Sequence, residues 1–334
     1  MNLGILGAGS IAGTMAQTIQ KLIESGCKDV TLYAVAARDL PRAQAFAAQY
    51  GAQKAFGSYE EMLADPALDL VYIATPHSHH YQHIKLCVAH GKHVLCEKAF
   101  TVNACQAEDA LRYAEAQGVL VTEAIWTRYQ PMRQMIRQVL DEGLIGTPGL
   151  LTANLCYPVS DRPRIVTPAL AGGALLDVGV YTLNFAEMVF GPADEAHASC
   201  TRNELGVDIT DQIVLTWKDG RAAHLTAGVT VASDRCGCIY GDRGYLVVEN
   251  INNPQSISVF DADHRLTQKI DCPVQLTGYE YEVLETMRCI QAGKLECPSM
   301  PHSETIHIME LMDKIRTQMG ISYPCEELDW PQLQ

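Results

Sequence analysis

Short apolar segments alternate with amphipathic segments over the first part of the chain. The apolar runs cover residues 3–6, 30–37, 70–75, 93–97 and 119–124, and residues 51–58 add a short strand. Between them apolar residues recur at helical spacing, as at Ile84, Cys87 and Val88. Strands that alternate with helices predict a parallel sheet covered on both faces. Residues 1–124 are therefore predicted to form a doubly wound Rossmann-type α/β domain.

The pattern becomes richer in strands after residue 125. A helix over 129–142 precedes runs typical of strands at 149–157, 211–220, 221–231 and 244–250. Asp219-Gly220 and the GDRG sequence at 241–244 provide residues for tight turns, so the strands that they join should pair antiparallel. Helices at about 177–189, 279–293 and 303–319 would cover one face. Residues 125–334 are predicted to form a second α/β domain with a mainly antiparallel sheet.

Composition narrows the class of partner. The chain has 334 residues and a net charge of -14, and it contains no run rich in lysine or arginine. This balance argues against nucleic acid or an anionic membrane as the main partner. The start of the chain lacks the basic region of a signal peptide, and the 12 cysteines are scattered through it. We expect a cytoplasmic protein with reduced thiols.

The sequence G-A-G-S-I-A directly follows the first strand, at residues 7–12. In such a loop Gly7 permits the tight turn, Gly9 lets the backbone approach a pyrophosphate, and Ala12 allows close packing of helix on strand. Ser10 and Ile11 open the helix, whose N–H groups would face the phosphates. The alternative is a structural turn that is merely rich in glycine. The strand–loop–helix context favours a dinucleotide site.

Two arginines follow the second strand, where an NAD enzyme would carry an acidic residue for the ribose. The sequence there is Ala36-Ala37-Arg38-Asp39, and Arg42 comes one helical turn after Arg38. Two guanidinium groups could hold a 2′-phosphate. NADP is therefore favoured over NAD, the alternative being that Arg38 and Arg42 are ordinary surface charges.

Several motifs together resemble one family. They are G-A-G-S-I-A (7–12), A-A-R-D (36–39), A-T-P-H-S-H-H (74–80), C-E-K-A (96–99), E-A-I-W-T-R (123–128) and G-G-A-L-L-D-V-G-V-Y (172–181). The chain resembles the Gfo/Idh/MocA oxidoreductases, and within them the dimeric dihydrodiol dehydrogenases and the NADP-dependent D-xylose dehydrogenases. The resemblance implies a large open sheet in the second domain, a sugar-like or diol substrate, and a homodimer or a dimer of dimers.

The resemblance also implies which residues carry the chemistry. The family's Glu-Lys-Pro signature is Glu97-Lys98-Ala99 here, so the lysine is kept and the proline is lost. Asp177 and Tyr181 match the family's second catalytic pair. Lys98 beside a tyrosine would stabilise the phenolate, which makes Tyr181 the base. The reverse assignment, with Lys98 as the base, stays open.

Further residues are expected near the cofactor or the substrate. Asp177 would orient Lys98 or a substrate hydroxyl, or else cap its helix, and Glu97 would touch the cofactor ribose or act as a structural partner. By the same resemblance Thr75 and Pro76 edge the nicotinamide, and His80 starts the following helix. Candidates for the substrate pocket are Trp126, Arg128 and Arg164, for which packing or surface roles are equally compatible with the sequence.

The histidines at 77, 79, 80 and 83 suggest a different class of protein, a metal-dependent hydrolase. A hydrolytic zinc site needs a third ligand and a carboxylate base, which the sequence does not place beside them. We therefore expect no metal site, and we expect His77, His79 and His83 to be exposed or capping residues. A non-catalytic NADP-binding regulator is the other alternative to a dehydrogenase.

Overall fold

The computed structural model describes residues 1–327, which form two compact units. The first unit contains Met1–Trp126 and Gln275–Ile306, and the second contains Thr127–Val274 and the described residues from His307 onward. The boundary expected at residue 124 is thus close to the point where the chain leaves the first unit. Residues 275–306, expected in the second domain, belong to the first unit instead.

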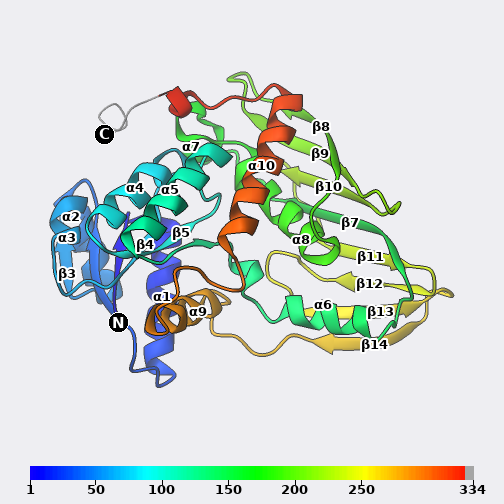
Figure 1. Cartoon of the computed structure of the whole chain (residues 1–334), viewed down its shortest axis with the longest axis horizontal. Helices are drawn as coiled ribbons and strands as arrows, with labels where there is room; N and C mark the ends of the chain where they lie inside the picture. Colours follow the sequence, from blue (N-terminus) through cyan, green and yellow to red (C-terminus); the bar gives the residue numbers. More distant parts are fainter. Residues whose placement is uncertain (328–334) are drawn as a thin grey trace. The chain divides into compact units, whose positions relative to one another are not determined.

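The first unit is built on a six-stranded parallel sheet (Figure 1). Its strands are β1 (Asn2–Leu6), β2 (Thr31–Ala36), β3 (Lys54–Phe56), β4 (Leu70–Ile73), β5 (His93–Glu97) and β6 (Val121–Ala124), in the order β3-β2-β1-β4-β5-β6. The helices are α1 (Ser10–Glu24), α2 (Leu40–Tyr50), α3 (Tyr59–Leu63), α4 (His77–Ala89), α5 (Ala104–Gln117) and α9 (Glu280–Gln291). A short 3₁₀ turn, η1 (Trp126–Arg128), ends this part of the chain.

The returning helix α9 completes the core of the first unit. Val283 and Met287 of α9 are buried in one hydrophobic cluster with Leu3 and Ile5 of β1 and Met15 of α1. The periodicity of α9 identifies it as a helix but does not indicate which hydrophobic core it joins. Its residues were therefore assigned to the second domain, although they pack in the first unit.

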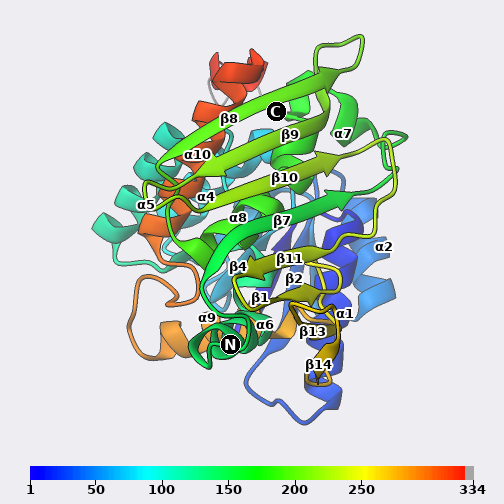
Figure 2. The ribbon, with the colours of Figure 1, turned by 90° about the vertical axis from the view of Figure 1, so that its right-hand side faces the viewer.

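The second unit is built on an eight-stranded mixed sheet (Figure 2). Its strands are β7 (Pro148–Cys156), β8 (Glu195–Arg202), β9 (Asp208–Thr216), β10 (Ala222–Gly228), β11 (Gly237–Gly241), β12 (Gly244–Val248), β13 (Ser256–Asp261) and β14 (Leu266–Asp271). The order is β14-β13-β12-β11-β7-β10-β9-β8, and only β7 and β10 pair in parallel. The expected turns at Asp219-Gly220 and at 241–244 join β9 to β10 and β11 to β12.

Helices cover one face of this sheet. They are α6 (Met132–Asp141), α8 (Val180–Phe190) and α10 (His302–Met319), with the short segments α7 (Pro163–Val166), η2 (Pro168–Leu170) and η4 (Pro324–Glu327). The strands alternate accordingly: in β12, Leu246 is buried while Tyr245 and Val247 are half-buried. Figure 2 shows the strands in front and α8 and α10 behind them.

A π-helix, η3 (Leu175–Gly179), runs directly into α8. The surrounding segment Pro168–Phe190 is long and apolar enough to cross a membrane, but 89% of its apolar stretch is buried inside the protein. Such burial is typical of a core helix. Single π-turns inside helices often occur at functional sites, and this one carries Asp177.

Candidate active site

The glycine loop at the end of β1 has the geometry that a dinucleotide requires. Gly7 has a φ of +105°, and its N–H donates to the carbonyl of Ala36 at 2.9 Å. A Cβ at Gly9 would meet no atom within 4 Å, so the space above the loop is open. No side chain caps the start of α1, and Ser10 at this start is exposed while Ala12 is fully buried. The loop fits a pyrophosphate.

Arg38 and Arg42 lie beside this loop. Both are exposed, and Arg42 donates from Nη2 to the carbonyl of Ala8 at 3.0 Å. Burial raises the pKa of Tyr59, and the charges of both guanidinium groups oppose that rise. Asp39 occupies the N-cap position of α2, and Pro41 lies in the first turn of this helix, where proline is tolerated. The side chain of Asp39 makes no capping hydrogen bond. The end of β2 is therefore cationic.

His80 joins the ends of β4 and β5. Its Nδ1 lies 2.8 Å from the carbonyl oxygen of Ala99 and its Nε2 lies 2.9 Å from that of Thr75. Burial lowers the pKa of His80 to about 4, so the ring is neutral and donates to one of the two carbonyls at a time. Helix α4 begins at His77 with Pro76 at its N-cap, so the prediction that His80 starts the helix is wrong by three residues.

Lys98 directly follows β5, and its backbone is hydrogen-bonded to Glu97. Glu97 is buried; its Oε1 accepts a hydrogen bond from the Tyr72 hydroxyl, and its Oε2 accepts one from the backbone N–H of Lys98 at 3.2 Å. The Lys98–Ala99 peptide is cis, and Ala99 is fully buried. The Lys98 side chain is half-buried at the carboxyl edge of the sheet. Glu97 therefore supports the position of the lysine through its backbone.

A second carboxyl group lies near Glu97. Glu282 of α9 is fully buried, and no described residue hydrogen-bonds to either of its side-chain oxygens. Burial, and then the charge of Glu97, raise the pKa of Glu282 well above its usual value. Glu282 is therefore held as the neutral acid.

The second unit places Asp177 and Tyr181 on the segment formed by η3 and α8. Asp177 is on the π-turn, and Tyr181 is the second residue of α8. Arg164 donates from Nη1 to Oδ1 of Asp177 at 2.7 Å, with the carboxylate buried and the guanidinium half-exposed. The structure thus gives Arg164 a defined role as the ion-pair partner of Asp177.

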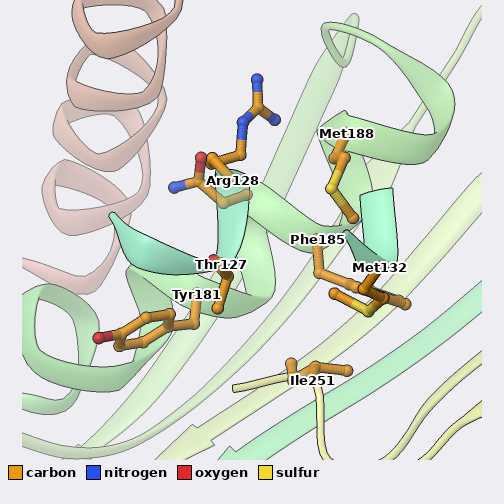
Figure 3. A pocket seen from close by; sticks show the side chains of 8 residues that line it. Thr127, Arg128, Met132, Tyr181, Phe185, Met188 and Ile251 are labelled. Atoms are coloured by element: carbon orange, nitrogen blue, oxygen red, sulfur yellow. The ribbon is translucent and has the colours of Figure 1, made fainter. Parts of the chain in front are cut away.

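The remaining pocket candidates differ in their surroundings. Trp126 is buried and stacks on Tyr279, with ring centroids 4.1 Å apart. Arg128 and Tyr181 line a narrow gap of the second unit; its other lining residues are Thr127, Met132, Asn184, Phe185, Met188 and Ile251 (Figure 3). The gap has about 180 Å³ of empty space, below the roughly 300–1,000 Å³ of ligand pockets. Figure 3 shows the guanidinium of Arg128 and the hydroxyl of Tyr181 pointing in different directions.

The histidine cluster is part of the buried face of α4. His77, His80 and His83 recur at helical spacing, and all three are buried, so the prediction that His77 and His83 are exposed or capping is wrong. Thr75 Oγ1 lies 2.9 Å from Nδ1 of His83, and burial lowers the pKa of His83 to about 3. Within residues 1–327, no group of three or more potential ligands is arranged to hold a metal.

Sequence reasoning missed the supporting residues Tyr72, Glu123 and Glu282. Oε1 of the buried Glu123 accepts a hydrogen bond from the backbone N–H of Phe100 at 3.2 Å, so it also supports the segment after Lys98. The available signal was a carboxylate inside an apolar run, as in VLVTEA at 119–124. Buried carboxylates require partners, which makes such positions worth testing.

Comparisons with known proteins identify the family of the chain. Residues 1–125 match the family described as "Oxidoreductase family, NAD-binding Rossmann fold", and residues 133–247 match the "GFO/IDH/MocA C-terminal domain". Trans-1,2-dihydrobenzene-1,2-diol dehydrogenase of Homo sapiens is 33% identical over 328 residues, which cover 96% of this chain and 97% of the human protein. The Xenopus laevis enzyme of the same name is 32% identical over 330 residues, covering 96% and 98%.

Solved structures with the same fold include two oxidoreductases. A 3-ketoreductase from Actinomadura kijaniata, in complex with NADP and TDP-benzene, has a TM-score of 0.86 at 24% identity, covering 96% of this chain and 98% of its own. An aldose-aldose oxidoreductase from Caulobacter crescentus has a TM-score of 0.84 at 19% identity, covering 95% and 97%. The chain belongs to the Gfo/Idh/MocA oxidoreductase family and is an NAD(P)-dependent dehydrogenase acting on CH–OH groups.

Proposed function

We propose that the protein is an NADP-dependent oxidoreductase that oxidises a sugar-like or trans-diol alcohol or hemiacetal, with Lys98 and Tyr181 as its acid–base pair. The observation that carries the proposal is the placement of Lys98 at the carboxyl edge of the parallel sheet, the edge that also bears the glycine loop and Thr75. Ligands of such sheets bind at this edge. The names of the dihydrodiol dehydrogenase relatives support the substrate class.

The chemistry divides between the cofactor and the protein. The bound nicotinamide accepts the hydride from carbon, and the protein must take the proton from oxygen. Tyr181 would take this proton as the phenolate, and the Lys98 ammonium would lower the cost of that charge. Asp177, with its charge balanced by Arg164, would orient the reacting hydroxyl. Glu97 would keep the backbone of Lys98 in place.

Residues of the first unit favour NADP over NAD. Two guanidinium groups lie near the glycine loop, and Ala36 and Ala37 stand where a carboxylate would bind the ribose hydroxyls. Thr75 and Pro76 would edge the nicotinamide. His80 would hold that edge in shape without touching the cofactor itself, because its ring is fully buried between two backbone carbonyls.

We further propose that the protein acts as a homodimer in the cytoplasm. Tyr240, Tyr245 and Phe260 lie next to one another on the sheet of the second unit, with the Tyr245 and Phe260 rings stacked at 4.9 Å. These half-buried rings alternate with the residues that face the helices. We propose that a second copy of this chain covers this aromatic surface, because the family resemblance implies a homodimer. The 12 cysteines are unpaired thiols, in keeping with a reducing compartment.

The test combines a substrate panel with two substitutions. Sugars and trans-dihydrodiols are assayed by NADPH absorbance with the wild type, Tyr181→Phe and Lys98→Met. We expect turnover to fall by about 10²-fold or more in both variants while NADPH binding survives. Tyr113→Phe and Lys218→Met, which remove the same groups elsewhere, serve as controls. Unchanged turnover in both site variants would refute the mechanism, and NADPH binding without turnover on the whole panel would favour a regulatory protein.

A further inference from the structure

Two aspartates face the helices from within the sheet of the second unit. Asp208 and Asp211 of β9 are both fully buried. Residues three apart normally point to opposite faces of a strand. Here Thr201 of β8 pairs with Thr210 and Arg202 pairs with Asp208, so Ile209 is an extra residue of a β-bulge. The bulge turns the side chain of Asp208 to the same face as that of Asp211.

Asp208 meets the start of the segment that carries Asp177 and Tyr181. Its Oδ2 accepts a hydrogen bond from the backbone N–H of Leu175 at 2.7 Å. This N–H belongs to the first turn of η3, where backbone donors lack partners within the helix. The carboxylate of Asp208 therefore caps the π-turn from the sheet.

The two glycines before the helix make this contact possible. Gly173 has a φ of +137°, and a Cβ there would lie 2.2 Å from Oδ1 of Asp208. A Cβ at Gly172 would lie 2.4 Å from the carbonyl oxygen of Ile165. Gly173 thus lets the backbone approach the buried carboxylate closely, and Gly172 lets it pass close to the carbonyl of Ile165.

Asp211 lies next to Asp208 without a donor of its own. Its one hydrogen-bond partner is the carboxyl group of Asp208, and no other described residue hydrogen-bonds to either oxygen of Asp211. Burial raises the pKa of both carboxyl groups, and the neighbouring charge of Asp208 raises that of Asp211 further. Other ionisable groups nearby are the buried Tyr323 and the half-buried Cys200, which interact in turn with Arg316 and with Arg202, the ladder partner of Asp208. Neither arginine donates a hydrogen bond to Asp211. Two adjacent buried carboxylates are costly, whereas one proton between them forms a hydrogen bond.

We propose that Asp208 and Asp211 are positioning residues for the dehydrogenase reaction. The ionised Asp208 caps the helix that carries Asp177 and Tyr181, and the protonated Asp211 donates to Asp208 and holds it in place. This inference rests on the proposed roles of Asp177 and Tyr181 in turnover. It goes beyond them by assigning a function to two residues that touch neither substrate nor cofactor.

Kinetics of four variants of the full chain test the proposal. We expect Asp208→Ala and Asp211→Ala to lower kcat about tenfold or more, since small displacements of catalytic groups are costly, and to leave NADPH affinity unchanged. Asp211→Asn keeps a neutral donor of the same shape, so it should retain most of the wild-type kcat. The control is Asp242→Ala, which removes an exposed aspartate that accepts from the backbone N–H of Thr147. Normal kcat in Asp208→Ala, or equal losses in Asp211→Asn and Asp211→Ala, would overturn the proposal.

Two measurements need no turnover and thus separate this proposal from the proposed function. Amide hydrogen exchange over residues 174–181 should be faster in Asp208→Ala than in the wild type, and unchanged in Asp211→Asn and Asp242→Ala. The infrared band of a protonated carboxyl group at neutral pH should be weaker in Asp211→Asn than in the wild type. Unaltered exchange in Asp208→Ala would refute the positioning role even if no substrate is found. The same holds if Asp211→Asn loses the band of an ionised carboxylate and keeps that of the protonated acid. Because Asp211→Asn is a conservative change, the infrared test stays available should the alanine variants fail to fold.

Discussion

At the scale of single residues, the proposed preference for NADP rests on the short segment after β2. Ala36 and Ala37 offer no carboxylate, and the guanidinium groups of Arg38 and Arg42 both act on Tyr59. A 2′-phosphate carries a negative charge that such groups bind, whereas a ribose hydroxyl gains little from them. Under the proposal, these few residues would distinguish two cofactors that are identical elsewhere.

Replacement of Arg38 by alanine should therefore weaken NADP much more than NAD. We expect the dissociation constant of NADPH to rise about tenfold or more, the scale of one lost charge-assisted contact, and that of NADH to change little. Titration of NADPH and NADH fluorescence measures both constants. Arg112→Ala, which removes an exposed arginine of α5, is the control. Equal changes for the two cofactors would remove the case for phosphate recognition.

At the scale of elements, helix α9 carries an acid, Glu282, that feels the charge of Glu97 at the end of strand β5. Burial and this charge hold Glu282 as the neutral acid, so its protonation is linked to folding. The unfolded chain releases the Glu282 proton above about pH 4.3, whereas the folded chain holds it to much higher pH. The contribution of Glu282 to stability is therefore complete below this value and is lost progressively as pH rises towards the folded pKa.

Replacing Glu282 by glutamine should remove this loss. We expect the stability of Glu282→Gln relative to the wild type to increase with pH from 5 to 8, by up to about 1.4 kcal/mol per pH unit. Urea unfolding at several pH values measures this difference. The control is Glu108→Gln, a substitution of an exposed glutamate on α5, which should show no such trend. A difference that stays constant with pH would show that Glu282 is ionised in the folded protein.

The elements that sequence reasoning found and those it missed differ in pattern. The alternation of apolar runs with helical segments predicts β1, β2, β4, β5 and β6 well, because strands buried on both faces are continuously apolar. Strands β8 and β14 were missed because EAHASCTR and LTQKID are largely exposed and carry no such run. The glycine loop and Lys98 were found from local motifs. Glu282 and the Asp208–Asp211 pair were not, because long-range packing alone brings their carboxyl groups together.

At the scale of the whole molecule, the sheet of the second unit bears a row of aromatic rings. Tyr240, Tyr245 and Phe260 come from three neighbouring strands, so their contacts depend on the register of the sheet. Aromatic residues are enriched on surfaces between protein chains, and these three rings are half-buried in the single chain. A dimer formed there would use a surface that only the folded sheet creates.

Placing charge on this surface should dissociate the dimer. We expect the wild type to sediment as a dimer, and Tyr245→Glu to weaken dimerisation at least about tenfold because a charge would be buried without a partner. Sedimentation velocity over a range of concentrations measures this change. Leu205→Glu replaces an exposed residue of the β8–β9 turn and should leave the dimer intact. A monomeric wild type, or an unaffected Tyr245→Glu variant, would contradict the proposed interface.

The return of the chain to its first unit also determines the order of events during synthesis. The ribosome makes the strands β1 to β6 early, but Val283 and Met287, which complete their core, come about 160 residues after the last of these strands. All of Thr127–Val274 is translated in between. Part of the apolar surface of the first unit therefore stays uncovered while the ribosome synthesises the entire sheet of the second unit. Chaperones that bind exposed apolar segments would meet the chain during this interval.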